Sequence, residues 1–161
     1  MDWTIIQQAL PAYGHGFVLT VWLSLVGIIG SIIVGVIASL LQYFKTPILS
    51  QIATAYVELA RNTPLLIQLF FLYYAFPVIG WRMSSITAGI IGLIFLGGGY
   101  MAEGFTGGFQ GVTDSQINSG EALGMNRFQL ARYVVFPQGF ALSMPALAAN
   151  VIFLIKETSI F

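Results

Sequence analysis

Long apolar runs with few charges between them dominate the pattern along this chain. No charged residue lies between Asp2 and Lys45, and residues 17–44 have the pattern of one apolar helix, longer than the roughly 20 residues needed to cross a bilayer. Three further uncharged runs follow, at 62–81, 83–102 and 133–155. The pattern therefore predicts an all-α, polytopic membrane bundle with four spans.

The first span carries small residues at every fourth position. Gly27, Ser31, Gly35 and Ser39 would share one stripe of the helix, and small side chains let helix backbones approach closely in lipid. We therefore expect this stripe to be a helix-packing seam.

A second glycine feature ends the third predicted span. Gly97, Gly98 and Gly99 weaken a helix, and we expect them to terminate it. Exposed backbone in a membrane must be buried in protein or face a wet path, so the three glycines indicate either a translocation route or close helix packing.

The short apolar stretch 46–57 leads into two charges, Glu58 and Arg61. Because these residues lie three apart on a helix, we expect them to form an ion pair, and we expect the stretch 46–57 to be the start of the second span. If the chain lines a route for a solute, Arg61 is the one basic residue that could favour an acidic solute, although an ion pair with Glu58 would cancel its charge. The residues alone leave the choice of substrate open.

The distribution of basic residues predicts the orientation of the spans. Lys45, Arg127 and Arg132 follow spans one and three, whereas Arg82 falls on the opposite side. Positive residues are retained in the cytoplasm, so we expect residues 1–15 to form an external N-terminal segment and residues 103–137 an internal loop.

The predicted internal loop, 103–137, is polar and carries helix-capping signals. Asp114 and Ser115 can cap a short helix over 116–123, and Gly124 would end it in the left-handed conformation. Asn126 can cap a second helix, which we expect Pro137 to interrupt. The loop has the character of a docking element, although an ordinary structured connection would show the same signals.

The amino-acid composition excludes several further classes of protein function. Apolar residues make up 57% of the 161 residues and charged residues 7%, the formal net charge is zero, and the chain contains no Cys and one His. A neutral chain offers no basic surface for nucleic acid, and a lone His cannot build a multi-His metal site. We expect neither a metal nor a cofactor. A cleavable signal peptide is disfavoured because the apolar run is longer than a signal core.

Four ordered motifs carry a family resemblance. They are ELARNTPLLIQLFF from Glu58, YMAEGFTGGFQ from Tyr100, QINSGEALG from Gln116 with RYVVFPQGF from Arg132, and KETS from Lys156. Together they resemble the permease subunits of binding-protein-dependent ABC importers in the polar amino acid family, which take up histidine, glutamate, glutamine, arginine and opines.

The resemblance implies a type I ABC importer transmembrane domain over residues 16–161. It also implies a second permease subunit, identical or different, an ATP-binding subunit, an extracytoplasmic amino-acid-binding protein and a prokaryotic inner membrane. The chain has no phosphate-binding Gly-Lys-Ser/Thr loop, so ATP hydrolysis is expected on the separate subunit. Because family members continue past the KETS segment, we also expect this chain to be truncated at its C-terminus.

The resemblance also implies roles for particular residues. Coupling to the ATPase is expected at Asp114, Gln116, Asn118, Ser119, Gly120, Glu121 and Gly124. Polar groups proposed for the substrate path are Arg61, Thr63, Gln68 and Tyr100.

The chain departs from the family pattern at three places. Asn118-Ser119-Gly120 replaces Glu-Ala-Ala, Thr106 replaces Arg, and Asn62 replaces Gly.

Two other classes of protein stay open. One is a truncated remnant, or a membrane protein that only assembles with others without transporting. The other is a secondary transporter that uses intramembrane charges without an ATPase.

Overall fold

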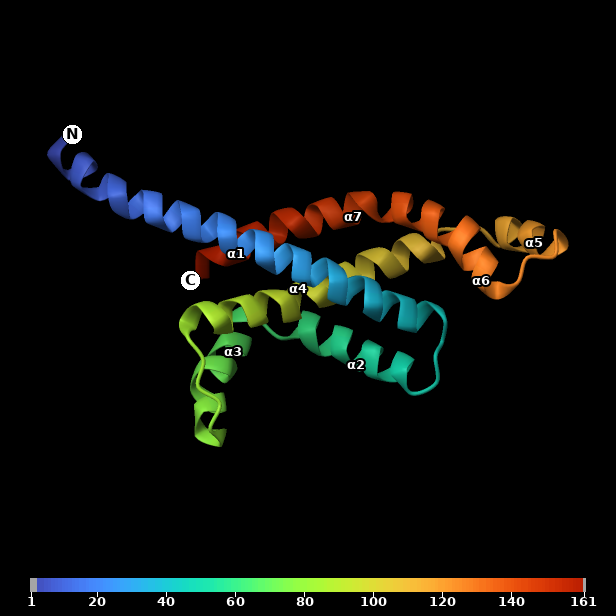
Figure 1. The fold of residues 1–161 in the computed structure, drawn as a ribbon, viewed down its shortest axis with the longest axis horizontal. Coiled ribbons are helices and arrows are strands. Elements are labelled where there is room, and N and C mark those ends of the chain that lie inside the picture. Colours follow the sequence, from blue (N-terminus) through green and yellow to red (C-terminus); the bar gives the residue numbers. More distant parts are fainter. Residues whose placement is uncertain (1–2, 161) are drawn as a thin grey trace.

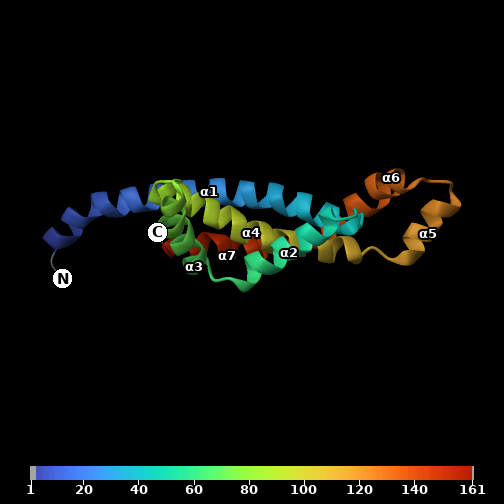
Figure 2. The same ribbon diagram turned by 90° about the horizontal axis from the view of Figure 1, so that it is seen from below.

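The computed structural model describes residues 3–160, and every regular element in that range is helical. The main helices are α1 (Trp3–Tyr43), α2 (Leu49–Asn62), α3 (Leu65–Phe70), α4 (Ser85–Gln110), α5 (Asp114–Ala122), α6 (Arg127–Leu130) and α7 (Phe136–Glu157). Shorter turns are the π segments η1 (Phe71–Ala75) and η3 (Ala131–Val135) and the 3₁₀ segments η2 (Phe76–Ile79) and η4 (Thr158–Ile160). Helices α1, α4 and α7 run along the long axis, and α5 and α6 lie beyond one end (Figures 1 and 2).

Three helical stretches are long and apolar enough to cross a membrane, namely Ala9–Tyr43, Ser85–Gln110 and Arg127–Ile160. A fourth candidate is a broken pair, Leu49–Asn62 with Leu65–Ile79, bent by 105°. The four predicted spans are therefore present when the broken pair counts as one.

The second span begins within the stretch 46–57, as predicted, but it is broken rather than continuous through 62–81. Its first half, α2, begins at Leu49, and the chain breaks at Thr63 and Pro64. Proline disfavours the helical conformation in the residue before it, and Thr63 is extended, with φ −112° and ψ 120°. The Thr-Pro pair therefore ends α2 inside the bundle and turns α3 away from it.

The first helix starts earlier than predicted. It begins at Trp3 rather than at residue 17, so most of the predicted external segment 1–15 is helical. Forty-one residues at 1.5 Å each give about 61 Å, roughly twice the thickness of a bilayer core. The N-terminal part of α1 accordingly extends past the other helices (Figure 1).

The predicted seam of small residues is confirmed as the contact between α1 and α4. A Cβ on Gly27 would lie 3.2 Å from Leu93 Cβ, and a Cβ on Gly35 would lie 2.5 Å from Met101 Cβ. The Ser31 hydroxyl is buried and donates a hydrogen bond to the Leu93 carbonyl at 3.2 Å. Small side chains at this interface let the two backbones approach closely.

The predicted helix end at the three glycines is wrong, because α4 continues through them to Gln110. Of the two roles expected for them, close helix packing is confirmed, because each glycine allows another helix to come close. A Cβ on Gly97 would meet Ser31 of α1 and Leu154 of α7, a Cβ on Gly98 would meet Tyr56 of α2, and a Cβ on Gly99 would lie 2.9 Å from Ala60 of α2. The packing of three helices outweighs the weak helix propensity of glycine.

Part of the helix capping predicted for the connection between α4 and α7 is confirmed. Gly124 has a φ of +80°, and Asn126 forms a capping box with Gln129. The residue that caps α5, however, is Thr113, and its side chain makes no capping hydrogen bond, while Asp114 lies in the first turn of the helix. Because α4 reaches Gln110, the loop is also shorter than the predicted 103–137.

Pro137 does not interrupt the helix that leads into the membrane. The π segment η3 ends at Val135, directly before α7, and the Phe136 N–H donates a hydrogen bond to the carbonyl of Ala131, five residues back. A regular α-helix would press the proline ring against the carbonyl four residues earlier. The wider π turn relieves this clash, so the chain stays helical from Arg127 into α7.

Candidate functional site: a charged path along α2 and α4

Two cavities follow one another along α2 and α4. The first, which we call the Tyr100 cavity, has a volume of about 310 Å³, and its polar lining comes from Arg61, Asn62, Thr63, Tyr100 and Glu157. The second, the Glu103 cavity, has a volume of about 390 Å³, and its polar lining comes from Gln42, Thr54, Glu58, Arg61, Glu103, Thr106 and Gln110. Arg61 borders both cavities.

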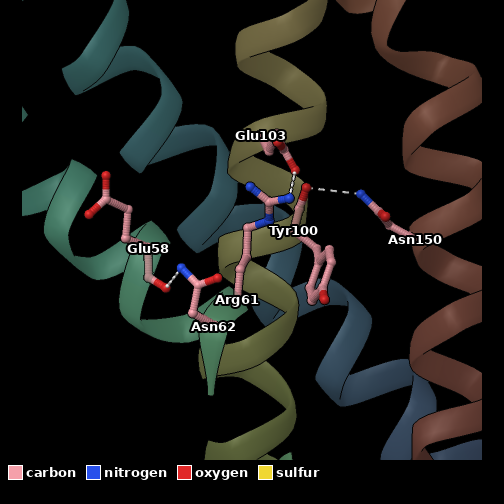
Figure 3. A network of polar contacts seen from close by, with 6 residues as sticks. All are labelled: Glu58, Arg61, Asn62, Tyr100, Glu103 and Asn150. Atoms are coloured by element: carbon pink, nitrogen blue, oxygen red, sulfur yellow. Dashed lines mark hydrogen bonds and ion pairs between the residues drawn. The ribbon is translucent and has the colours of Figure 1, made fainter. Parts of the chain in front are cut away.

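Arg61 reaches across from α2 to α4. Its Nη2 lies 2.5 Å from Glu103 Oε2, and its Cζ lies 5.4 Å from the centre of the Tyr100 ring (Figure 3). Gly99 makes this possible, because a Cβ at that position would lie 3.3 Å from the Arg61 Cγ. The missing side chain leaves room for the stem of the arginine on the surface of α4.

The predicted pair between Glu58 and Arg61 is therefore wrong. The Glu58 carboxylate points away from Arg61, and the backbone carbonyl of Glu58 accepts a hydrogen bond from the side chain of Asn62 at 2.8 Å (Figure 3). The spacing of three residues allowed a pair within α2, but Glu103 on the neighbouring helix offers the arginine a contact at 2.5 Å. Within the part of the chain that the structure describes, Glu58 adds an acidic group without an ion-pair partner.

The Arg61–Glu103 pair is only partly shielded. The side chains are 34% and 54% exposed, and the buried Arg61 Nε has no hydrogen-bond partner among the described residues. Charged groups within membrane spans usually face other protein or a water-filled cavity, because lipid cannot solvate them. The pair thus marks the wet side of α2 and α4.

Gln68 has a different place from the other three predicted path residues. Arg61, Thr63 and Tyr100 surround the Tyr100 cavity, whereas Gln68 is buried at the break between α2 and α3. Its Nε2 donates to the carbonyls of Ala60 at 3.1 Å and Thr63 at 2.9 Å. These bonds satisfy backbone acceptors that the end of α2 would otherwise leave free.

Several polar contacts at this site were not predicted from the sequence. Asn150 on α7 donates to the Tyr100 carbonyl at 2.9 Å (Figure 3). Gln42 joins α1 to both neighbouring helices, since it donates to Thr54 at 3.3 Å and accepts from Thr106 at 3.1 Å. Only Glu103 could have been identified from the sequence. If the third span is taken to continue as a helix through the three glycines, this charged residue falls inside the span.

The predicted coupling residues gather on α5 and the turn that follows it, and α5 projects from the end of the bundle (Figure 1). Asp114, Gln116, Asn118, Ser119, Glu121 and Gly124 are exposed. Gly120 is buried, and a Cβ there would lie 2.5 Å from Leu130 Cδ2, so its small size lets α5 pack against α6. Beside them, Leu123 is 79% and Phe128 is 70% exposed.

Among the described residues, no group of three or more His, Asp or Glu side chains could hold a metal ion.

Comparison with known proteins identifies the family. The profile described as "Binding-protein-dependent transport system inner membrane component" matches residues 31–161. The glutamine transport system permease protein GlnP of Escherichia coli K12 is 31% identical over 162 residues, covering 99% of this chain and 74% of the relative. The probable amino-acid permease protein YxeN of Bacillus subtilis 168 is 34% identical, covering 99% of this chain and 73% of the relative.

Solved structures agree with the sequence comparison. An amino acid ABC transporter crystallised with histidines matches with a TM-score of 0.91 at 28% identity, covering 99% of this chain and 75% of that chain. The MetNI methionine ABC transporter matches with a TM-score of 0.80 at 18% identity, which shows the shared fold.

The chain thus belongs to the family of inner membrane components of binding-protein-dependent transport systems. It is a multi-pass permease subunit of an amino acid ABC importer, and ATP hydrolysis resides on a separate subunit. An ATPase and a binding protein are accordingly its partners, and the alternative of a secondary transporter is set aside.

Proposed function

We propose that polar amino acids, with glutamine and histidine as the first candidates, pass along the Tyr100 and Glu103 cavities. The similarity over 99% of the chain to a glutamine permease carries this proposal, and the match to a transporter crystallised with histidines supports it. The chemistry of the cavities agrees, because a polar amino acid needs hydrogen-bonding groups to replace its hydration. Arg61, Thr63 and Tyr100 supply such groups, and they lie in or next to helices that contribute to the candidate spans.

A second permease subunit, identical or different, would cover this path. Glu103 is 54% exposed and Glu58 is exposed, yet both lie in helices that contribute to candidate spans. Lipid would leave these carboxylates without solvation. A second subunit facing α2 and α4 would enclose them in a path shared by the two subunits.

The segment from Asp114 to Gly124 would seat on the ATPase. Helix α5 presents Asp114 and Glu121 to the outside, and Leu123 adds an exposed apolar side chain of the kind that anchors protein interfaces. With Asn118-Ser119-Gly120 in place of the family's Glu-Ala-Ala, one carboxylate is missing from this contact. We therefore expect the choice of ATPase partner to differ from that of relatives with the usual motif.

Reconstituted transport tests the proposed function. In proteoliposomes that contain the permease and its ATPase, labelled glutamine or histidine supplied with the binding protein should accumulate only with ATP on the ATPase side. An ATPase variant that binds but does not hydrolyse ATP is the control. Uptake that proceeds without ATP, or uptake of neither amino acid, would contradict the proposal.

Orientation is a separate proposal, with the N-terminus outside and α5 inside. The connection between α1 and α2, which contains Lys45, and helix α6, which begins at Arg127, lie at the end of the bundle opposite the N-terminal part of α1 (Figures 1 and 2). This arrangement supports the orientation that the distribution of positive charges predicts. Cysteines introduced singly at Tyr13 and Gln116, both exposed, would test it in the otherwise cysteine-free chain. An impermeant thiol reagent added outside should label position 13 and spare position 116, and the reverse pattern would show the opposite orientation.

A further inference from the structure

The two cavities of the path are stacked along the bundle and meet at Arg61. On α4 the Tyr100 cavity is lined by Leu96 and Tyr100, and the Glu103 cavity is lined by residues from Glu103 onward to Gln110. On α2 and the segment after it, the residues that line the Glu103 cavity come first in the sequence and those that line the Tyr100 cavity follow, because α2 and α4 are antiparallel. Arg61 is the one lining residue that the two cavities share. Its guanidinium therefore lies where a solute would pass from one cavity to the other.

The contacts of Arg61 close this boundary. The ion pair with Glu103 and the cation–π contact with Tyr100 fasten the end of α2 to α4, with one partner lining each cavity. Yet the guanidinium is not saturated, since its Nε has no partner among the described residues. Arginine can bind a carboxylate through two parallel hydrogen bonds, so an incoming carboxylate could compete with Glu103 for it.

We propose that the Arg61–Glu103 pair is the gate between the two cavities, and that the α-carboxylate of the substrate opens it by replacing Glu103 on the guanidinium. This inference rests on the proposed function, because it assumes that amino acids use these cavities. No covalent bond changes; one ion pair is exchanged for another. Every amino acid carries the α-carboxylate, so Arg61 recognises amino acids as a class and does not distinguish acidic, amide and basic side chains.

The test separates closing the gate from opening it. Proteoliposomes with the complete transporter are loaded with labelled glutamine, and its leak is measured without ATP, beside ATP-driven uptake. Glu103→Gln should raise the leak at least tenfold, because the gate loses its ion pair. The reversed pair, Arg61→Glu with Glu103→Arg, restores the attraction and should return the leak to near the parent value.

Uptake provides the decisive readout. The reversed pair should still lose at least tenfold in uptake, because a glutamate now meets the incoming α-carboxylate at position 61. A purely structural ion pair would instead recover both leak and uptake on reversal, and that result would overturn the proposal. Arg82→Gln removes a positive charge from an exposed position in the connection before α4 and should change neither readout.

Failure of the gate and failure of the proposed function have different signatures. If the parent complex imports glutamine and Glu103→Gln stays as tight as the parent, the gate is wrong while the function stands. If the parent imports neither glutamine nor histidine, the proposed function fails, and the leak of the Glu103→Gln vesicles still reports on the gate. Size-exclusion chromatography of each variant complex shows that a changed leak does not come from a disassembled transporter.

Discussion

Gly108→Ala is expected to destabilise the permease by about 3 kcal/mol, the upper part of the usual range for overpacking. A Cβ at Gly108 would lie 2.8 Å from the backbone nitrogen of Ser143 and would also collide with the Ser143 hydroxyl and the Gly139 carbonyl. Because two of these three atoms belong to the α7 backbone, the clash cannot be relieved by a side-chain rotation. Helix α7 would have to move away from α4.

The thermal midpoint of the purified protein measures this effect. For a chain of this size, a loss of 3 kcal/mol corresponds to a decrease of roughly 6 to 12 °C. Gly107→Ala is the matched control in the same helix, since a Cβ at Gly107 would meet no atom within 4 Å. Equal midpoints for the two variants would show that α4 and α7 do not pack as described.

Gly124→Val is expected to reduce ATP hydrolysis stimulated by the binding protein at least tenfold. Gly124 has a φ of +80°, a left-handed conformation that costs an L-residue about 1–2 kcal/mol and a β-branched residue more. No atom lies within 4 Å of a Cβ placed there, so the effect would come from the backbone alone. A changed turn would redirect α5, which is the proposed contact with the ATPase.

Gly124→Asn is the control for this prediction, because asparagine adopts the left-handed conformation more readily than other non-glycine residues. It should keep most of the stimulated hydrolysis. Basal hydrolysis by the ATPase should be similar in the parent and in both variants. If Gly124→Val couples as well as the parent, the orientation of α5 does not control the ATPase.

Features that depend on local composition could be predicted from the sequence. Long uncharged runs located the spans, because charged side chains are rare in the core of a bilayer wherever the helix packs. The four-residue period of Gly27, Ser31, Gly35 and Ser39 revealed a packing seam, and Asn126 and Gly124 were identified from capping rules that involve only near neighbours. The family itself was visible in four ordered motifs, and the comparisons confirm it.

The sequence indicated that some residues pack against another helix, but it did not show which helices meet. Pro137 was expected to break a helix, but a π turn accommodates it, and the three glycines were expected to end α4, although packing against α1, α2 and α7 keeps them helical. The partner of Arg61 followed from that same packing. Helix rules offered Glu58 three residues away, but Gly99 brings α2 against α4 and Glu103 within 2.5 Å.

The sequence by itself thus determined that this protein is a membrane-spanning permease with a capped loop between its spans, because hydropathy, caps and motifs are properties of short segments. Only the tertiary structure decided where the charged path runs and which groups line it. Ion pairs and cavities form between segments distant in sequence, here 42 residues apart for Arg61 and Glu103, and their geometry depends on how closely the helices approach.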